Sequence, residues 1–492
     1  MKTNGLVCAG LLAAGAFAHK GPALTPDRIE RDIRQRDLKN VLTGLHKVAS
    51  ENGGNRAFGL PGYEASVDFV LDRFRGHLGK QFHTYVQPFT HLFSTTQAIS
   101  LTGPDGVDVD VITLQYNNPT PVPDGVTGAL VALPIDDEVG SGCIESQWEG
   151  IDATGKIALI KRGSCAISDK LKLAKDKGAL GVVLFNNEPG SSISSATLGA
   201  ENYGTLAPCA VTTLEKGTEW KDLVDAGDSV EVKLIVDAIA EERESWNVIA
   251  ETKAGDPNNV VMLGAHLDSV QEGAGINDDG SGTAALLEIA SALKKYKHIN
   301  NKIRLAWWGA EESGLIGSIH YVSQLSEKEK DKVRFYFNYD MIGSIAPIYA
   351  VYGDTDAHKT GGHILFDYLT EKGYPAEWGS FGEDSDYLAF IEAGIPSSGL
   401  FTGAGAPEDP CYHTACDNMD NISWEALTIN AKAAARAAAE LANSLEGVPP
   451  RDKTTVNPSS KRGVSRDLTK WNQVARGLGK KHSCSGDKKS TV

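Results

Sequence analysis

The stretch Val-Val-Met-Leu-Gly-Ala-His-Leu-Asp-Ser at residues 260–269 is a short apolar run that ends in polar side chains. Similar apolar runs follow at Ile303 to Trp308 and Val333 to Tyr339, and the helix-like segment Thr283 to Tyr296 separates the first two. Short apolar strands that alternate with helices predict an α/β fold, in which helices cover both faces of a mostly parallel, mixed sheet. Because ligands in such sheets bind beyond the carboxyl ends of the strands, the residues after each run are candidates for function.

The overall composition is that of an ordinary globular protein. The chain has 492 residues, 41% of them apolar and 23% charged, and its 48 Lys and Arg against 64 Asp and Glu give a formal charge of −16. At this length two domains are expected, and a disordered chain or a small disulfide scaffold is excluded. The net acidity disfavours binding to nucleic acid.

Acidic and histidine side chains collect at the predicted strand ends. They are His266 and Asp268 after the first run, Asp278 and Asp279 before the helix, Glu311 and Glu312 after the second run, Asp340 after the third, and His413 further on. Two carboxylates about 4 Å apart repel each other by about 4 kcal/mol at an effective dielectric constant of 20. The cluster therefore requires a positive partner.

Imidazole and carboxylate ligands without cysteine favour zinc over calcium or magnesium, and cobalt and manganese also suit them. Two dications balance three carboxylates and a hydroxide, whereas one would leave the cluster negative, so we expect two ions. Taken singly, each residue has another explanation: His266 as a core histidine, Asp279 as a helix cap and Asp340 as part of a turn. Their shared position at successive strand ends favours the metal.

The first eighteen residues are typical of a cleaved secretory signal, because Lys2 precedes the apolar stretch Leu6 to Phe17 and a small-residue ending. No other segment is apolar over a length that would span a membrane. We therefore expect a secreted, extracellular protein. Cleavage would leave six cysteines, an even number in a compartment that permits disulfides. The one Asn-x-Ser/Thr sequon predicts glycosylation at Asn421.

The remaining chain divides into segments that differ in sequence pattern. We expect residues 19–120 to form the first part of the domain that carries the candidate site, helical from Pro26 to about Thr90, with an extended stretch at Thr84 to Leu101. Short β-like runs in residues 121–240 predict an inserted module, and residues 241–446 carry the candidate site. The tail 447–492 has eleven Lys or Arg against three Asp and no apolar periodicity, which predicts a disordered appendage or a segment removed at Lys461-Arg462.

At these motifs the sequence resembles the secreted di-zinc aminopeptidases of the leucyl and aminopeptidase Y type, with an inserted protease-associated (PA) domain. The resemblance covers nearly all of residues 36–446. Its most specific motifs are Gly-Ala-His-Leu-Asp-Ser (264–269), Gly-Ile-Asn-Asp (275–278), Trp-Trp-Gly-Ala-Glu-Glu (307–312), Asp-Met-Ile-Gly-Ser (340–344) and Tyr-His-Thr (412–414). Residues 155–163 and Asn186-Asn187 carry the similarity to the PA domain.

The resemblance implies a zinc exopeptidase fold and two Zn²⁺ ions per chain. One ion would be held by His266 and Asp340, the other by Glu312 and His413, and both by Asp278. The same resemblance implies that Glu311 is the general base and that Tyr412 donates a hydrogen bond to the developing oxyanion. Asp268 is a candidate to fix the tautomer of His266, and Asp386 a candidate for a similar part.

The resemblance also implies two disulfides. Cys411 with Cys416 would hold the loop of Tyr412 and His413, and Cys143 with Cys165 would lie in the inserted domain, while Cys209 and Cys484 stay unassigned. One departure is notable: many relatives have Gly-Arg-Ser-Asp where this chain has Glu383-Asp384-Ser385-Asp386. The lost cation bears on side-chain preference rather than on the chemistry.

The expected substrates are peptides with a free N-terminus, because an acidic floor attracts an α-ammonium group and repels a carboxylate. A leucine-like first residue is what the resemblance implies, and we expect a monomer that binds neither membrane nor nucleic acid. The alternatives are a zinc carboxypeptidase or glutaminyl cyclase of the same fold, and a non-catalytic PA-domain binding protein. Neither a Gly-x-Ser-x-Gly nor a His-Glu-x-x-His motif occurs in the sequence, so two common hydrolase classes are excluded.

Overall fold

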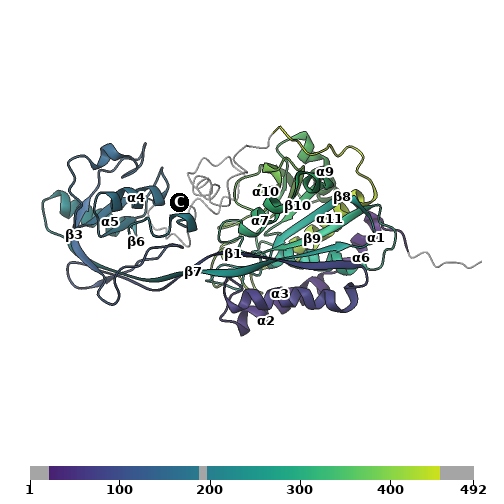
Figure 1. Ribbon diagram of the computed structural model, residues 1–492, viewed down its shortest axis with the longest axis horizontal. Helices are drawn as coiled ribbons and strands as arrows, with labels where there is room; N and C mark the ends of the chain where they lie inside the picture. The colour runs from purple at the N-terminus through teal and green to yellow at the C-terminus, as the bar shows by residue number, and fades with distance from the viewer. Residues whose placement is uncertain (1–21, 188–196, 455–492) are drawn as a thin grey trace, which may run out of the picture.

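Two long paired strands join the two lobes of the molecule (Figure 1). The computed structural model describes residues 22–187 and 197–454. Strand β1 (Phe82–Thr102) pairs antiparallel with β7 (Glu231–Thr252) along nearly its whole length, and this ribbon runs from the large lobe into the small one. The large lobe contains the chain before β1 and after β7, and the small lobe contains the residues between these strands.

The sheet of the large lobe is mixed, as the sequence predicts. Besides β7 it contains β8 (Asp256–His266), β9 (Asn301–Trp308), β10 (Val333–Tyr339), β11 (Tyr349–Tyr352), β12 (Ala376–Gly379) and β13 (Ser397–Phe401). Their order is β12-β11-β13-β10-β8-β9-β7. Strands β9, β8, β10 and β13 are parallel neighbours, whereas β7 and β11 pair antiparallel with β9 and β13. The three central strands include the three apolar runs of the sequence.

Helices cover both faces of this sheet, which confirms the predicted fold class. One face packs against α1 (Pro26–Asp32), α2 (Gln35–Glu51), α3 (Pro61–Arg73), α6 (Gly280–Leu293), α9 (Asp356–Glu371) and α11 (Trp424–Asn443). The other packs against α7 (Ile316–Gln324) and α10 (Tyr387–Glu392), and the short α8 (Glu327–Lys332) precedes β10. Strand β8 alternates accordingly: Val261 and Leu263 face the first layer, and Val260 and Met262 face the second.

The N-terminal helical region is shorter than predicted. A π-helical turn at Phe74–Leu78 follows α3, and the helical region ends there rather than near Thr90. Strand β1 matches the extended stretch predicted at Thr84 to Leu101. The helix predicted at Thr283 to Tyr296 is α6, which begins at Gly280. The side chain of Asp279 caps it by accepting a hydrogen bond from the backbone N–H of Gly282 at 2.8 Å. This is the capping role that the sequence left open for Asp279.

The small lobe continues the sheet through β7. Its strands are β2 (Asp108–Val109), which pairs with β1, and the parallel set β3 (Val126–Ala132), β4 (Ile157–Lys161), β5 (Gly181–Phe185) and β6 (Cys209–Thr212). Helices α4 (Ile167–Asp176) and α5 (Leu214–Asp225) pack on this set. The predicted boundary at residue 121 is too late, because Leu101, Leu114 and Tyr116 are buried in the cores of this lobe.

The predicted tail begins too early at residue 447. Val448 is buried in the large lobe, and the buried Arg451 donates to the carbonyl oxygen of Ala393 at 2.9 Å and pairs with Asp331 at 3.1 Å. Residues 447–454 therefore belong to the folded lobe. The rest of the predicted tail and the signal at 1–18 lie outside the described residues. Within the described ranges, no helix has the length and apolar character needed to cross a lipid bilayer.

Candidate metal centre

The five predicted metal ligands meet at one end of the large-lobe sheet. His266 ends β8, Glu312 follows β9, Asp340 follows β10, Asp278 lies just before α6, and His413 lies between β13 and α11. Because β8, β9 and β10 are parallel neighbours, their carboxyl ends share one edge, and the loops that leave this edge bring the ligands together.

Asp278 lies between the two imidazoles. Its Oδ1 is 3.0 Å from Nε2 of His266, and its Oδ2 is 3.2 Å from Nε2 of His413. Nε2 of His413 is also 3.0 Å from Oε2 of Glu312. The carboxylate of Asp278 thus faces both halves of the cluster, which is the position required of a bridging ligand.

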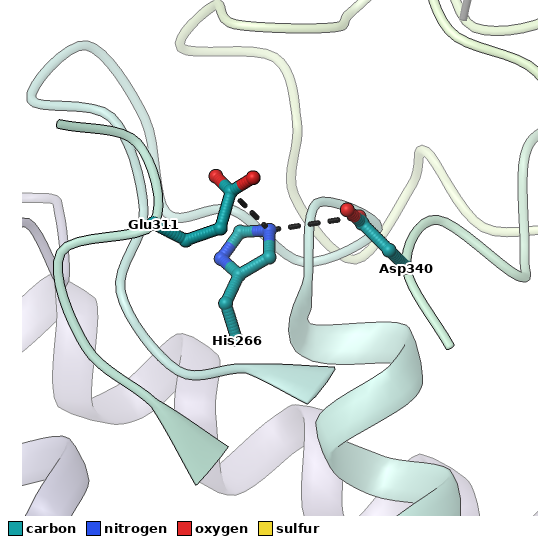
Figure 2. Close-up of side chains that lie close together, drawn as sticks. All are labelled: His266, Glu311 and Asp340. Atoms are coloured by element: carbon teal, nitrogen blue, oxygen red, sulfur yellow. Dashed lines mark ion pairs between the residues drawn. The ribbon is translucent and has the colours of Figure 1, made fainter. Parts of the chain in front are cut away.

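Glu311 and Asp340 lie near the imidazole of His266, as Figure 2 shows. Oδ1 of Asp340 is 3.5 Å and Oε2 of Glu311 is 3.9 Å from Nε2 of His266. Glu311 and Glu312 are adjacent in sequence, yet Glu311 lies next to His266 while Glu312 lies next to His413. The two glutamates therefore lie on opposite halves of the site, one beside each histidine.

Burial and mutual charge set the ionisation of this cluster. Burial acts to lower the pKa of His266, but the carboxylates of Glu311 and Asp340 outweigh it and hold that pKa well above its ordinary value. Burial raises the pKa of Glu312 to about 7, against the opposing effect of His413. Burial also raises the pKa of Glu311 well above its usual range. His266 and the two glutamates therefore tend to hold protons in the metal-free protein. A bound dication would displace these protons.

The donor set fits zinc. In two groups, His266 with Glu311 and Asp340, and His266 with Asp278 and Glu312, the ligand atoms lie within 4.8 Å of one another. Oε1 of Glu312 is buried and has no hydrogen-bond partner among the described residues. A buried carboxylate oxygen without a donor is a place that a cation can occupy, and imidazole with carboxylate oxygen is a ligand combination that zinc accepts.

Asp268 supports the site in a way the sequence only partly predicts. Its backbone oxygen is 3.2 Å from Nδ1 of His266, whereas its carboxylate lies farther away, at 3.7 Å. The carboxylate instead accepts hydrogen bonds from the backbone N–H groups of Glu311 at 3.1 Å and Glu312 at 3.3 Å. Asp268 therefore orients the predicted base and a predicted ligand as well as the imidazole.

Asp386 does not orient an imidazole as predicted. Within the described structure no hydrogen bond joins it to His266, and its Oδ1 has no hydrogen-bond partner. Burial, together with the charges of Asp340 and Asp268, raises the pKa of Asp386 to about 8. The neighbouring Ser385 has the closer contact, because its Oγ donates to Oδ2 of Asp340 at 2.6 Å and accepts from Nδ2 of Asn338 at 2.7 Å.

Arg56 is a functional residue that the sequence analysis missed. Its guanidinium is fully buried beneath the ligand loops, where it donates to the carbonyl oxygens of Leu267, Ala274 (2.9 Å) and Gly275 (2.6 Å). Its backbone N–H donates to Oγ of Ser269 at 2.9 Å. One arginine thus ties together the segment between His266 and Asp278.

Asp417 was also missed. Its carboxylate accepts hydrogen bonds from the backbone N–H groups of Asn277 at 2.9 Å and Asp278 at 3.0 Å. Burial raises the pKa of this carboxyl group to about 7, although these two hydrogen bonds act in the opposite direction. Asp417 lies four residues after His413, so the loop that carries one ligand also holds the backbone of another.

The backbone beside the ligands is strained. Ala310, Met341 and His413 all have φ values between 52° and 56°, in the left-handed region that residues with a Cβ rarely adopt. Each costs on the order of 1–3 kcal/mol, which the surrounding structure must offset. The disulfide Cys411–Cys416 encloses His413 and Tyr412, whose rings stack with centroids 3.7 Å apart.

The remaining predicted residues have mixed outcomes. The disulfide Cys143–Cys165 is present in the small lobe, Cys209 is buried and unpaired within the described chain, and Cys484 lies outside it. A glycan on Asn421 does not fit this structure. The side chain is 5% exposed, and its Nδ2, the atom that would carry the sugar, donates to Asp409 at 2.8 Å and Asp417 at 3.2 Å.

Comparison with known proteins places the chain in a family. Residues 247–438 match the model of peptidase family M28, and residues 126–220 match the PA domain. The chain is 37% identical to leucine aminopeptidase 2 of Arthroderma otae, over 90% of this chain and 91% of that protein. It is 38% identical to an aminopeptidase of Pseudomonas aeruginosa, over 85% and 83% of the two chains. The chain therefore belongs to peptidase family M28 and carries an inserted PA domain.

Solved structures extend the likeness to the fold. An aminopeptidase from Aneurinibacillus sp. strain AM-1 superposes with a TM-score of 0.72 at 28% identity, covering 85% of this chain and 96% of that one. A zinc aminopeptidase from Bacillus subtilis gives a TM-score of 0.66 at 26% identity, with 86% and 98% of the chains covered. Both alignments take in most of the two lobes.

Proposed function

We propose that this protein is a secreted aminopeptidase that removes N-terminal residues, preferably leucine-like ones, from peptides with the help of two zinc ions. The observation that carries the proposal is the placement of Asp278 between His266 and His413, with a glutamate beside each imidazole. The aminopeptidase names of relatives that align over most of this chain support the reaction and the substrate class.

The residues divide the work in a definite way. His266 and Asp340 would hold one ion, Glu312 and His413 the other, and Asp278 both. Bound zinc supplies Lewis acidity, which lowers the pKa of a water molecule and polarises a carbonyl group. Glu311, buried beside His266, takes the proton of the attacking water on its carboxylate and passes it to the nitrogen of the leaving amine. Tyr412 lines a small pocket together with most of these ligands. Its hydroxyl would donate a hydrogen bond to the developing oxyanion.

A small pocket beside the ligands suits the N-terminal residue of a substrate. Glu311, Asp340 and Asp384 provide negative charge for the α-ammonium group, and the apolar lining consists of Met341, Phe401 and Ala404. Among the described residues that line this pocket there is no Lys or Arg to receive a terminal carboxylate. The pocket therefore favours an aminopeptidase over a carboxypeptidase.

Secretion rests on the signal-like residues 1–18 and on the two disulfides, which are typical of oxidising compartments. N-terminal sequencing of protein recovered from the culture medium tests this part. A mature chain that begins at His19 supports it, and a protein that stays inside the cell with Met1 intact overturns it.

Matched peptides test the reaction. Leu-Gly-Gly should be hydrolysed to leucine and Gly-Gly, whereas acetyl-Leu-Gly-Gly should resist cleavage because the acetyl group removes the positive charge that the acidic pocket attracts. Dialysis against a chelator should abolish the activity, zinc should restore it, and elemental analysis should find two zinc ions per chain. Efficient hydrolysis of the acetylated peptide, or full activity without metal, contradicts the proposal.

A further inference from the structure

A second, larger cavity opens on the other side of Glu312 and His413. Its volume is about 140 Å³, and residues of both lobes line it. We call it the interlobe cleft. Glu312 and His413 line it beside the metal ligands, and Gln115 and Thr197 of the small lobe also line it. Strand β1 contributes Ser94, Thr95 and Thr96, and the loop after β8 contributes Gln271 and Glu272.

The two cavities share Glu312 and His413 as a common wall. An aminopeptidase substrate has only one residue before the scissile bond, and the small acidic pocket provides for that residue. The remainder of the peptide must leave the reaction centre by another route. The interlobe cleft is the cavity that reaches the same two ligands and then leads away from them.

The lining of the cleft has the chemistry of a peptide-binding surface. Gln115 and Thr95 are half-buried, and among the described residues neither the amide of Gln115 nor the hydroxyl of Thr95 takes part in a hydrogen bond. The backbone of Gln115 is held by a bridge to Thr197 and by the N–H of Leu198, which donates to its carbonyl oxygen at 3.0 Å. Within the described part of the chain Gln115 therefore has a fixed backbone and a side chain without a hydrogen bond, and an extended peptide offers the N–H and C=O groups that such side chains bind.

The charge of the cleft selects against short substrates. Asp268, Glu272 and Glu312 line it, and no Lys or Arg does so among the described residues. Asp268 accepts hydrogen bonds from backbone N–H groups, and Glu312 belongs to the metal cluster. Glu272, in contrast, is exposed. A dipeptide would place its terminal carboxylate in this acidic surrounding, but a longer peptide carries that charge farther away.

We propose that the interlobe cleft binds the substrate residues that follow the scissile bond, so that the inserted domain, through Gln115, makes the enzyme select oligopeptides over dipeptides and aminoacyl anilides. This inference rests on the proposed aminopeptidase function. It assigns the small lobe a share of the substrate site, which neither the metal ligands nor the small pocket requires.

The test compares kcat/KM for Leu-Gly-Gly-Gly, Leu-Gly, Leu-Gly-amide and leucine p-nitroanilide. The Gln115→Ala and Thr95→Val variants should each lower the ratio of the tetrapeptide value to the anilide value roughly 3- to 10-fold, as expected for a lost hydrogen bond. Glu272→Gln should reduce the difference in kcat/KM between Leu-Gly and Leu-Gly-amide. Thr127→Val is the matched control, because Thr127 is exposed on β3 and does not line the cleft.

The outcomes separate the inference from the function on which it rests. If the parent protein hydrolyses none of the four substrates, the aminopeptidase proposal itself is wrong. If the parent hydrolyses them with no preference for length, or if Gln115→Ala shifts the ratio no more than Thr127→Val does, only the role of the cleft is overturned. A residual activity on the anilide shows in each case that the variant is folded.

Discussion

The carboxylate of Asp268 accepts a hydrogen bond from the backbone N–H of Glu311 at 3.1 Å. This contact links the loop after β8 to the loop after β9, and the second oxygen of Asp268 extends it to the N–H of Glu312 at 3.3 Å. Burial raises the pKa of Asp268, while the charge of His266 and these hydrogen bonds favour the ionised form. A single buried carboxylate thus fixes the predicted base relative to the imidazole that it faces.

Replacing Asp268 with Asn should weaken both the chemistry and the metal site. The amide has one acceptor oxygen instead of two, so one of the two glutamate backbones loses its partner. We expect zinc affinity or kcat to fall roughly 10- to 100-fold, in line with changes in groups that orient ligands. Zinc titration and steady-state kinetics measure this. Values equal to those of the parent for both quantities would show that Asp268 has only a packing role.

Replacing Glu311 with Gln should remove proton transfer and leave the metal in place. The amide cannot accept the proton of the attacking water, so we expect kcat to fall by about 10²- to 10⁴-fold. Elemental analysis should find the zinc content of the parent. Glu312→Gln provides the contrast, because it should lose metal as well as activity. Retained turnover in Glu311→Gln would reject its role as the base.

The structure brings the five predicted metal ligands together, and for most of them a simple rule explains why. His266, Glu312 and Asp340 each lie at the end of an apolar run, and parallel neighbouring strands bring such positions to one edge. The fold class could also be predicted, because short apolar runs alternate with a helix-like segment along the sequence. His266 and Asp340, for instance, lie where the ends of their runs predict.

The supporting residues could not be predicted in this way. Arg56 lies 210 positions before His266 in the sequence, between α2 and α3, and only the packing of these helices brings it beneath the site. The contact of Ser385 with Asp340 likewise depends on tertiary structure. The burial of Asn421 is a further example, because a sequon alone does not reveal whether the amide is exposed.

Removing the buried charge of Arg56 should loosen the ligand loops. The Arg56→Met variant leaves three carbonyl oxygens without a donor and Asp268 and Asp417 without a nearby cation. We expect a loss of about 3–5 kcal/mol in the free energy of unfolding of the zinc-free protein, as for other broken buried charge interactions. Urea denaturation of the metal-free protein measures this loss.

Two further variants of arginine make the Arg56 experiment specific. Arg56→Lys keeps the charge but not the directed fork of donors, so it should lie between the parent and Arg56→Met. Arg36→Met changes an exposed arginine and should leave stability within about 0.5 kcal/mol of the parent. An Arg56→Met protein as stable as the Arg36→Met control would refute the role assigned to the guanidinium.

The disulfide Cys411–Cys416 should hold the strained loop around His413. Closing a loop this short stabilises a protein by roughly 2 kcal/mol in the chain-entropy description. The Cys411→Ser, Cys416→Ser double variant should therefore bind zinc more weakly and turn over more slowly, because His413 and Tyr412 lose part of their restraint. The Cys143→Ser, Cys165→Ser variant should leave zinc affinity unchanged, since that bridge lies in the small lobe. Equal zinc affinities in all three proteins would contradict the prediction.

Lys170 in the small lobe should make stability depend on pH. Its side chain is fully buried, with Nζ bonded to the carbonyl oxygen of Ser141, and burial lowers its pKa from 10.5 to about 8 against the weaker effect of Asp169. Below pH 8 both the folded and the unfolded chain carry the proton, so the folded state bears the full cost of burying the charge. Between pH 8 and 10.5 the folded state binds fewer protons than the unfolded one, and stability should rise.

The Lys170→Met variant isolates this effect, because it removes the titrating group. The free energy of unfolding of the parent relative to Lys170→Met should increase by at most about 3 kcal/mol between pH 7 and pH 10.5, which corresponds to the lowered pKa. Urea denaturation at a series of pH values measures the difference. Lys175→Met, an exposed change on the same helix, controls for the general effect of alkali and should show no such trend. A parent-to-Lys170→Met difference that stays level, or that falls as the pH rises, would mean that the ammonium group is not buried as a cation.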